Sequence, residues 1–297
     1  MMKTSLSVQE RDIKNLKKKV AYQGVKGAYS HLACHNQFPE YEAIACKSFD
    51  ETMYLVEEGE ADVAMIPMEN STAGRVEEIY RLIPKMKLHI IKEHYQPVNH
   101  CLLALPGTKI EDIKSVSSHP QALAQCKIHI EKYNLDAKAK FDTAGSAEEL
   151  INMQDKSHSA IASSLAAQIY DLEIIEEAFQ DIKNNTTRFL VLSKEHIVPK
   201  FDEGKKYITS IIFEVRNIPA ALYKVLGGFA TNNVNLIKIE SYSGSGTLTV
   251  SQFHIDVEGH PDEVNVKLAL EELAYFANTV KMLGTYIPHL MRENLRA

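Results

Sequence analysis

From residue 20 onward, short apolar runs alternate with segments whose apolar residues recur at helical spacing. Alternation of this kind is typical of an α/β domain, in which each run is a buried strand and each periodic segment a helix. Residues 1–19 lack both patterns and are rich in lysine, so we expect a polar N-terminal extension there. The strands predicted after it cover residues 20–23, 61–66, 89–95, 100–104, 115–117, 160–162 and 188–193.

The pattern breaks in a polar stretch at residues 193–206, which contains Pro199 and Gly204 and reads as a linker. Beyond this boundary the order of predicted elements is strand, helix, strand, strand, helix, strand. Such a βαββαβ order is ferredoxin-like. The predicted elements are strand 207–215, helix 220–230, strand 236–242, turn 244–246, strand 248–257, helix 261–277 and strand 280–286.

Composition narrows the possible functions. At 297 residues and 45% hydrophobic content the chain can bury a core in each of two domains, and its net charge of −6 argues against a general nucleic-acid surface. No apolar run is long enough for a membrane span, and residues 1–19 lack a secretory or organellar signal, so we expect a cytosolic protein. The four cysteines form no C-x-x-C pair and read as reduced thiols.

Polar side chains gather at three places where a predicted strand meets a helix, at residues 24–31, 67–75 and 118–126. In open α/β sheets ligands bind at the carboxyl ends of strands, so we expect the three junctions to converge. At the first, two glycines permit a tight turn, but the spacing is not that of a dinucleotide fingerprint. At the third, Ser118 or His119 is expected to cap a helix that Pro120 begins.

The second junction carries Asn70, Ser71 and Thr72, which are good N-cap residues for a helix expected to run through Arg81. Capping leaves Glu69 without a role, and its carboxylate could act as a cap, a base or an orienting group. His31, Cys34 and His35 stand at metal-ligand spacing, but no fourth ligand stands out, so no metal site is predicted. We expect His119 to cap or pack rather than to donate a proton.

These junctions, together with the run Asn184-Asn185-Thr186-Thr187-Arg188-Phe189, resemble the signature blocks of prephenate dehydratases. The resemblance implies a catalytic domain at residues 20–195 that resembles a two-lobed periplasmic binding protein. Lobe 1 would hold residues 20–97 and 180–195, approximately, and lobe 2 residues 98–179. The implied reaction is the decarboxylating dehydration of prephenate to phenylpyruvate in phenylalanine biosynthesis, which needs no cofactor.

By this resemblance, Thr187 helps the ring hydroxyl of the substrate to depart, and Glu69 and Asn70 complete the predicted catalytic group. Adjacent residues of a strand point to opposite sides. If only one of Thr187 and Arg188 faces the substrate, we choose Thr187, and Arg188 becomes structural, paired with an acid such as Glu69. Otherwise Arg188 grips a substrate carboxylate. The predicted substrate-binding residues are Ser30, Ser71, Ser118, Gln125 and Arg188.

Residues 207–286 resemble an ACT domain, a small-molecule sensing module, which implies phenylalanine as an allosteric effector. Alanine at position 220 replaces the usual glycine, and the family's Arg-Pro after Glu240 and Ser241 is missing. The edge strands of such a domain favour a homodimer or homotetramer. The predicted effector-binding residues are Asn217, Pro219, Ala220, Ala221, Leu222, Glu240 and Ser241.

Two other functions fit the same patterns. An arogenate dehydratase performs the same elimination on a substrate with an amine in place of the keto group. A non-catalytic amino-acid sensor would account for the binding-protein-like domain and the ACT-like domain but would give Thr187 and Glu69 no role. Turnover of prephenate separates the enzyme from the sensor.

Overall fold

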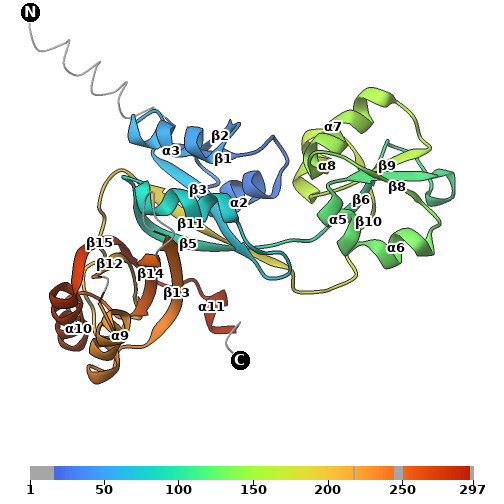
Figure 1. Cartoon of the computed structure of the whole chain (residues 1–297). Helices are drawn as coiled ribbons and strands as arrows, with labels where there is room; N and C mark the ends of the chain where they lie inside the picture. The colour runs from blue at the N-terminus through green and yellow to red at the C-terminus, as the bar shows by residue number, and fades with distance from the viewer. Residues whose placement is uncertain (1–16, 217, 244–249, 295–297) are drawn as a thin grey trace, which may run out of the picture. The chain divides into compact units, whose positions relative to one another are not determined.

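The computed structural model describes residues 17–216, 218–243 and 250–294. The chain forms two compact units, one of Met1–Ile79 with Gln96–Phe189 and the other of Tyr80–Tyr95 with Leu190–Ala297. Figure 1 follows the chain through both. The predicted turn at 244–246 and the predicted effector residue Asn217 lie outside the described residues.

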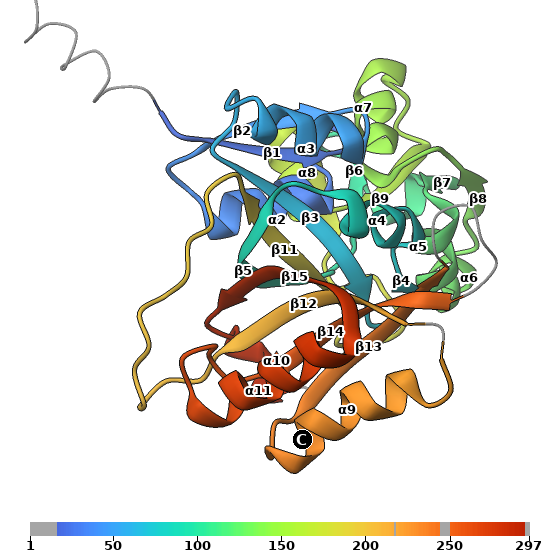
Figure 2. The same ribbon diagram turned by 60° about the vertical axis from the view of Figure 1, so that its left-hand side comes forward.

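The first lobe is built on parallel strands whose pairing brings the ends of β1 and β3 to one edge of a sheet. The sheet order is β2-β1-β3-β11-β5, with the short β4 beside β3. Helices α2 and α3 pack against β1 and β3 (Figure 2), and the Ser48 hydroxyl caps α3 by accepting a hydrogen bond from Glu51 N–H at 3.1 Å. The elements are β1 (Lys19–Gln23), α2 (Tyr29–Gln37), β2 (Glu42–Cys46), α3 (Phe49–Glu57), β3 (Val63–Asn70), β4 (Gly74–Arg75), β5 (His89–Pro97) and β11 (Thr186–Ser193).

The second lobe has a five-stranded sheet in the order β10-β6-β9-β7-β8 with helices on both faces (Figure 1). Successive residues of β6 serve the two faces: Leu103 packs with Ala147 and Leu150 of α7, and Leu102 packs in the opposite cluster with Ile130 of α6. The elements are β6 (Cys101–Ala104), β7 (Ser115–Ser118), α5 (Pro120–Gln125), α6 (Lys127–Lys132), β8 (Asp136–Ala139), α7 (Thr143–Met153), β9 (His158–Ala162), α8 (Ser164–Ile169) and β10 (Glu173–Glu176).

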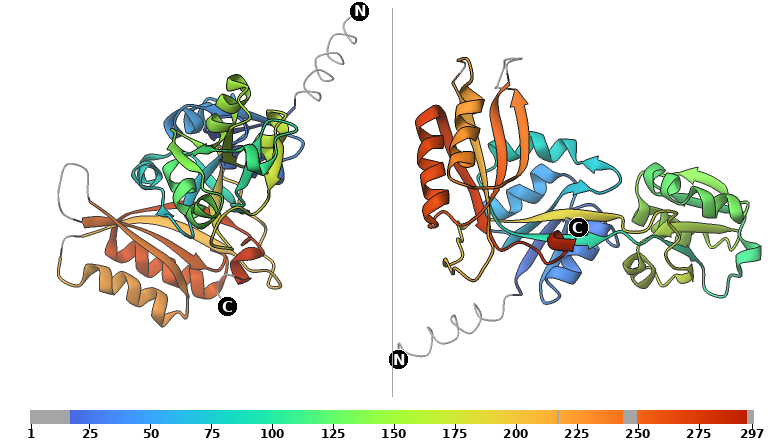
Figure 3. Two further views of the ribbon diagram at one scale, coloured as in Figure 1. Left: turned by 90° about the vertical axis from the view of Figure 1, so that its right-hand side faces the viewer. Right: turned by 90° about the horizontal axis from the view of Figure 1, so that it is seen from below.

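The C-terminal part confirms the predicted βαββαβ order. Its antiparallel sheet runs β13-β14-β12-β15, and α9 and α10 cover one face of it (Figure 3) around a core that includes Phe213, Phe229 and Leu273. The elements are β12 (Ile208–Val215), α9 (Ala221–Thr231), β13 (Leu236–Ser243), β14 (Val250–Glu258), α10 (Val264–Phe276), β15 (Ala277–Tyr286) and α11 (Met291–Asn294). None of the described helices has the length and apolarity that crossing a membrane requires.

The helix predicted to run through Arg81 is present, but the prediction that Asn70, Ser71 and Thr72 cap its N-terminus is wrong. Strand β3 continues to Asn70, the chain turns back, and β4 pairs with it in an antiparallel hairpin, so that α4 (Glu77–Leu82) begins later. Gly74 supplies the positive φ of +80° that this turn needs. The hairpin forms because the Asn70 side chain satisfies the turn's own backbone N–H groups, which removes the need for a helix there.

The four cysteines are buried free thiols, as predicted. Burial raises the pKa of Cys101 to about 11 and that of Cys126 to about 12, so both stay protonated at neutral pH. They are core residues rather than nucleophiles.

Candidate active site

A pocket of about 350 Å³ lies in the first unit, where the predicted junctions meet. That volume is within the range of small-molecule sites. Among the described lining residues none is acidic, and Arg75, which pairs with Glu77 at 2.6 Å, is the one side chain with a permanent charge. The lining consists of Tyr29, Asn70, Ala73, Gly74, Arg75, Val76, Val98, His100, His119, Gln121, Ala122, Gln125, Thr143, Asn185 and Thr187.

Asn70 is held at the end of β3 by the turn that follows it. Its Oδ1 accepts hydrogen bonds from the backbone N–H groups of Thr72 at 3.0 Å and Ala73 at 2.9 Å. Two backbone donors fix which atom of the amide faces the turn, so the amide nitrogen must face the other way. There it donates to Thr187 Oγ1 at 2.9 Å. The structure thus brings together Asn70 and Thr187, two of the three predicted catalytic residues.

Thr187 and Arg188 point to opposite sides of β11, as strand alternation predicts. Thr187 lines the pocket, whereas Arg188 is buried and its Nη1 donates to Glu69 Oε1 at 2.9 Å. Glu69 and Asn70 alternate in the same way on β3. Among the described pocket-lining residues neither Glu69 nor Arg188 appears. The geometry therefore matches the alternative in which Arg188 is structural and paired with Glu69.

Gln125 joins the two lobes at the pocket. Its Nε2 donates to Thr72 Oγ1 at 2.8 Å, across from the end of α5 to the turn after β3. Its Oε1 accepts from Asn185 Nδ2 at 3.1 Å. Asn185 in turn accepts from Asn70 Nδ2 at 2.7 Å. The predicted ligand-binding side chain of Gln125 is thus part of a polar network that ends at Asn70.

Two pocket residues, Tyr29 and His100, were not among the predicted site residues. His100 Nε2 lies 2.9 Å from Gln125 Oε1, and its Nδ1 lies 2.8 Å from the Tyr29 hydroxyl. Burial lowers the pKa of His100, although the Gln125 hydrogen bond opposes this, and burial raises the pKa of Tyr29 well above its ordinary value. At neutral pH both side chains are therefore uncharged.

The three predicted serines lie outside the described pocket lining. Ser71 ties the turn to β11, because its hydroxyl accepts from Thr186 N–H at 3.0 Å. Ser118 is fully buried and donates to the Ile161 carbonyl at 2.6 Å. Ser30 is in the first turn of α2. Their predicted contacts with substrate stay predictions.

His119 lines the pocket and caps α5, since its Nδ1 accepts from Gln121 N–H at 3.2 Å. The predicted capping role is confirmed, and Pro120 begins the helix as expected.

The predicted effector residues lie around the start of α9 and on β13. Ala220 precedes α9 with a positive φ of +61°, a conformation that suits glycine better than alanine. Ala221 is buried, Leu222 is half-buried and Pro219 is exposed. Glu240 and Ser241 are neighbours on β13. Their contact with an effector stays a prediction.

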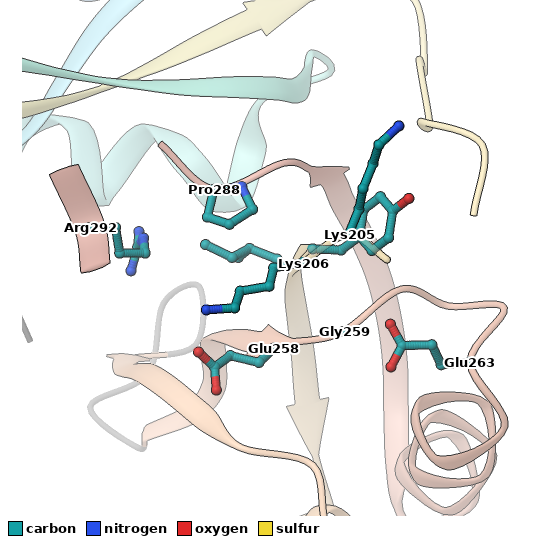
Figure 4. A pocket seen from close by; sticks show the side chains of 9 residues that line it. Lys205, Lys206, Glu258, Gly259, Glu263, Pro288 and Arg292 are labelled. Carbon is teal, nitrogen blue, oxygen red and sulfur yellow. The ribbon is translucent and has the colours of Figure 1, made fainter. Parts of the chain in front are cut away.

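A further pocket of about 420 Å³ lies in the C-terminal unit. Figure 4 shows Arg292 and Glu263 on opposite sides of it, with Lys206 and Glu258 between them. Arg292 already donates to the buried Glu93. The lining of this pocket carries charges of both signs, the cations Lys205, Lys206 and Arg292 and the acids Glu258 and Glu263.

The fold and the site define a two-lobed α/β protein with a pocket that is lined mainly by neutral hydrogen-bonding and apolar side chains. The family model of prephenate dehydratase matches residues 20–197, and the chain belongs to this family, as the sequence resemblance predicts.

Relatives extend the similarity beyond the matched residues. A bifunctional N-acyl-homoserine lactone acylase/prephenate dehydratase of Komagataeibacter europaeus is 42% identical over 90% of this chain and 95% of its own. Arogenate dehydratase 2 of Petunia hybrida is 38% identical over 95% of this chain and 75% of its own. The crystal structure of prephenate dehydratase from Arthrobacter aurescens in complex with L-Phe superposes with a TM-score of 0.81, at 30% identity over 91% of this chain and 89% of that one.

Proposed function

We propose that this chain converts prephenate to phenylpyruvate in its inter-lobe pocket. The observation that carries the proposal is the hydrogen bond from Asn70 Nδ2 to Thr187 Oγ1 at 2.9 Å. A threonine hydroxyl has one proton to donate and lone pairs to accept. Since Asn70 occupies a lone pair and the described residues supply no acceptor for the proton, the Thr187 O–H is available to a bound molecule.

The reaction needs such a donor. The bond between the ring and its carboxylate breaks, and the electron pair enters the ring as carbon dioxide leaves. The ring carbon–oxygen bond then breaks, and the departing hydroxide becomes water by taking a proton from the solvent. Aromatisation of the ring drives the reaction. Thr187 stabilises the charge that builds on the leaving oxygen, a contribution of about 10²- to 10⁴-fold in rate.

The pocket suits a dicarboxylate that must lose one carboxylate. Arg75 supplies attraction for the anion at the rim, where it is exposed. Val76, Val98 and Ala122 give the lining an apolar part, and a poorly solvated carboxylate leaves more readily as carbon dioxide.

Turnover by the purified full-length chain tests the proposal, with phenylpyruvate followed by its absorbance. Thr187→Val keeps the shape and removes the hydroxyl, so we expect kcat to fall by about 10²- to 10⁴-fold. Thr187→Ser keeps the hydroxyl and should stay within about tenfold of wild type. An inactive wild type, or full turnover by Thr187→Val, would contradict the proposal. Wild-type turnover would also exclude a non-catalytic sensor.

The pocket favours prephenate over arogenate. Arogenate carries an ammonium group, which a carboxylate would bind, and the described lining residues include none. We therefore expect a higher kcat/KM for prephenate when the two substrates are compared. A higher value for arogenate would make the chain an arogenate dehydratase.

The βαββαβ part is proposed as an ACT regulatory domain that binds phenylalanine near Ala220 and Glu240 and inhibits turnover. The prephenate dehydratase of Arthrobacter aurescens, whose structure is a complex with L-Phe, supports this effector. Calorimetric titration with phenylalanine tests it, and no binding at millimolar concentration together with unchanged turnover would refute it. The edge strands β13 and β15 support a homodimer or homotetramer, which light scattering distinguishes from a monomer.

A further inference from the structure

The polar side chains at the pocket form one directed chain of hydrogen bonds, and its direction can be worked out from the backbone. The N–H groups of Thr72 and Ala73 both point at Asn70 Oδ1, so the Asn70 amide cannot be turned over. Asn70 Nδ2 must then be the donor to Asn185 Oδ1. This makes the other end of Asn185, its Nδ2, the donor to Gln125 Oε1.

By the same reasoning, these hydrogen bonds form a closed ring. With its oxygen facing Asn185, Gln125 presents Nε2 to Thr72 Oγ1 at 2.8 Å. Thr72 has then used a lone pair as acceptor and gives its proton to Asn70 Oδ1 at 2.8 Å, which is nearer than its other acceptor, Asn185 Oδ1, at 3.3 Å. Gln125, Thr72, Asn70 and Asn185 therefore donate in one rotational sense. Bonds that run in one direction polarise one another, so the ring is stronger than its separate bonds.

His100 and Tyr29 are not members of this ring but are hydrogen-bonded to it through Gln125. Because Gln125 Oε1 is an acceptor, His100 must carry its proton on Nε2, 2.9 Å away. The Nδ1 of a neutral His100 is then an acceptor, and the Tyr29 hydroxyl lies 2.8 Å from it. The same hydroxyl can also donate to the Asn99 carbonyl at 3.0 Å, but the unprotonated Nδ1 of His100, which is 2% exposed, is nearer and can only accept. The Tyr29 proton therefore goes to His100.

The chain of hydrogen bonds begins at Tyr29 and ends at Thr187, which accepts the second N–H of the Asn70 amide. Resting on the proposed function, we propose that Tyr29 and His100 are positioning residues of the reaction, which act through Gln125 and the ring to hold the Thr187 hydroxyl as a donor to the substrate. Tyr29 and Asn70 come from the first lobe and Gln125 from the second. This chain of hydrogen bonds is complete only while Gln125 contacts Thr72 and Asn185.

Kinetics of full-length variants test the proposal. Tyr29→Phe removes the first donor, and we expect kcat to fall about 3- to 10-fold, with KM within about twofold, as for the loss of one hydrogen bond. Tyr170→Phe is the matched control, because its hydroxyl donates to the Lys26 carbonyl at 3.2 Å, outside the chain, and its kcat should not change. His100→Gln can still donate to Gln125 and should stay within about threefold of wild type. His100→Leu cannot and should fall about tenfold.

The histidine tautomer gives a readout that is independent of turnover. In ¹⁵N-histidine-labelled protein at neutral pH, with the His100 signals identified by their absence from His100→Leu, we expect Nε2 to carry the proton and Nδ1 to be a hydrogen-bond acceptor. A proton on Nδ1, or equal kcat for wild type and Tyr29→Phe, would overturn the proposal. A wild type that does not turn over prephenate would remove the proposed function, while the tautomer would still test the direction of the chain.

Discussion

Glu69→Gln should lower stability while leaving catalysis nearly intact. The sequence resemblance makes Glu69 a catalytic candidate, but the structure has Arg188 Nη1 donating to its Oε1 at 2.9 Å, on the side of the strands away from Thr187. If the pair anchors β11 to β3, its loss weakens the fold. The kcat for prephenate should then stay within about threefold of wild type.

The magnitude follows from the burial of the two partners. Breaking a fully buried ion pair costs about 3–5 kcal/mol. Here the Arg188 side chain is 5% exposed but that of Glu69 is 41% exposed, so solvent screens part of the interaction. Glutamine also keeps an oxygen that accepts from Arg188. Replacing a charge-assisted hydrogen bond by a neutral one then costs about 1–2 kcal/mol, a fall of about 3–6 °C in Tm.

Urea unfolding and steady-state kinetics of the same preparations measure both effects. Glu131→Gln is the matched control, because Glu131 pairs with Lys127 at 3.7 Å and both side chains are more than half exposed. Its unfolding free energy should change by less than about 0.5 kcal/mol. A hundredfold loss of kcat in Glu69→Gln with unchanged stability would show that Glu69 acts on the substrate and that the structural account is wrong.

Two further substitutions test the packing and the electrostatics of the first unit. Gly27→Ala should cost about 2 kcal/mol more in urea unfolding than Gly59→Ala, because both glycines have positive φ but only at Gly27 would a Cβ come within 3.0 Å of Ala166; equal costs would refute this. Burial raises the pKa of Asp181, but hydrogen bonds from residues 128–129 outweigh it and hold the pKa below 3.8. Asp181→Asn should therefore cost about 1 kcal/mol at pH 7 and progressively less as the pH falls through that lowered pKa; a cost that grows on acidification would contradict it.

The strands of the two lobes that the sequence misses are short and lie largely outside the core. Runs such as residues 160–162 are fully buried, so hydrophobicity alone marks them. Strands β2, β8 and β10 are largely half-buried or exposed, and each is only four or five residues long. Their pairing is decided by the neighbouring strand rather than by their own residues, so a single-sequence pattern cannot find them.

The residues of the candidate site also divide into those that the sequence predicts and those that it misses. Thr187, Asn70 and Gln125 belong to motifs that can be read locally, and strand alternation correctly separates Thr187 from Arg188. Asn185 could also have been found, because it lies two residues before Thr187 on the same face of the strand. Tyr29 lies in the first junction beside the predicted Ser30, but no local pattern links it to His100, because only the folded chain brings Tyr29 to His100 and His100 to Gln125.

The sequence correctly predicts that the Asn70 side chain accepts hydrogen bonds from backbone N–H groups, but it wrongly predicts that these belong to a helix start. A side chain that can satisfy backbone N–H groups marks a helix start or a tight turn equally well. The sequence around it favours the helix, whereas the local pairing of β4 with β3 and the long-range hydrogen bonds between Ser71 and Thr186 hold the turn. The choice matters for function, because in the turn Asn70 uses its oxygen on the backbone and keeps its nitrogen for Thr187.

Neutral groups are well suited to a site that must hold a dianion and release carbon dioxide. A carboxylate beside Thr187 would repel the substrate, and a buried ammonium would stabilise the very carboxylate that has to leave. Amides, hydroxyls and an uncharged imidazole can orient and polarise the Thr187 hydroxyl without either penalty. Strand alternation completes this separation of charge, since it sends Glu69 and Arg188 to the opposite face and leaves the pocket side of both strands to Asn70 and Thr187.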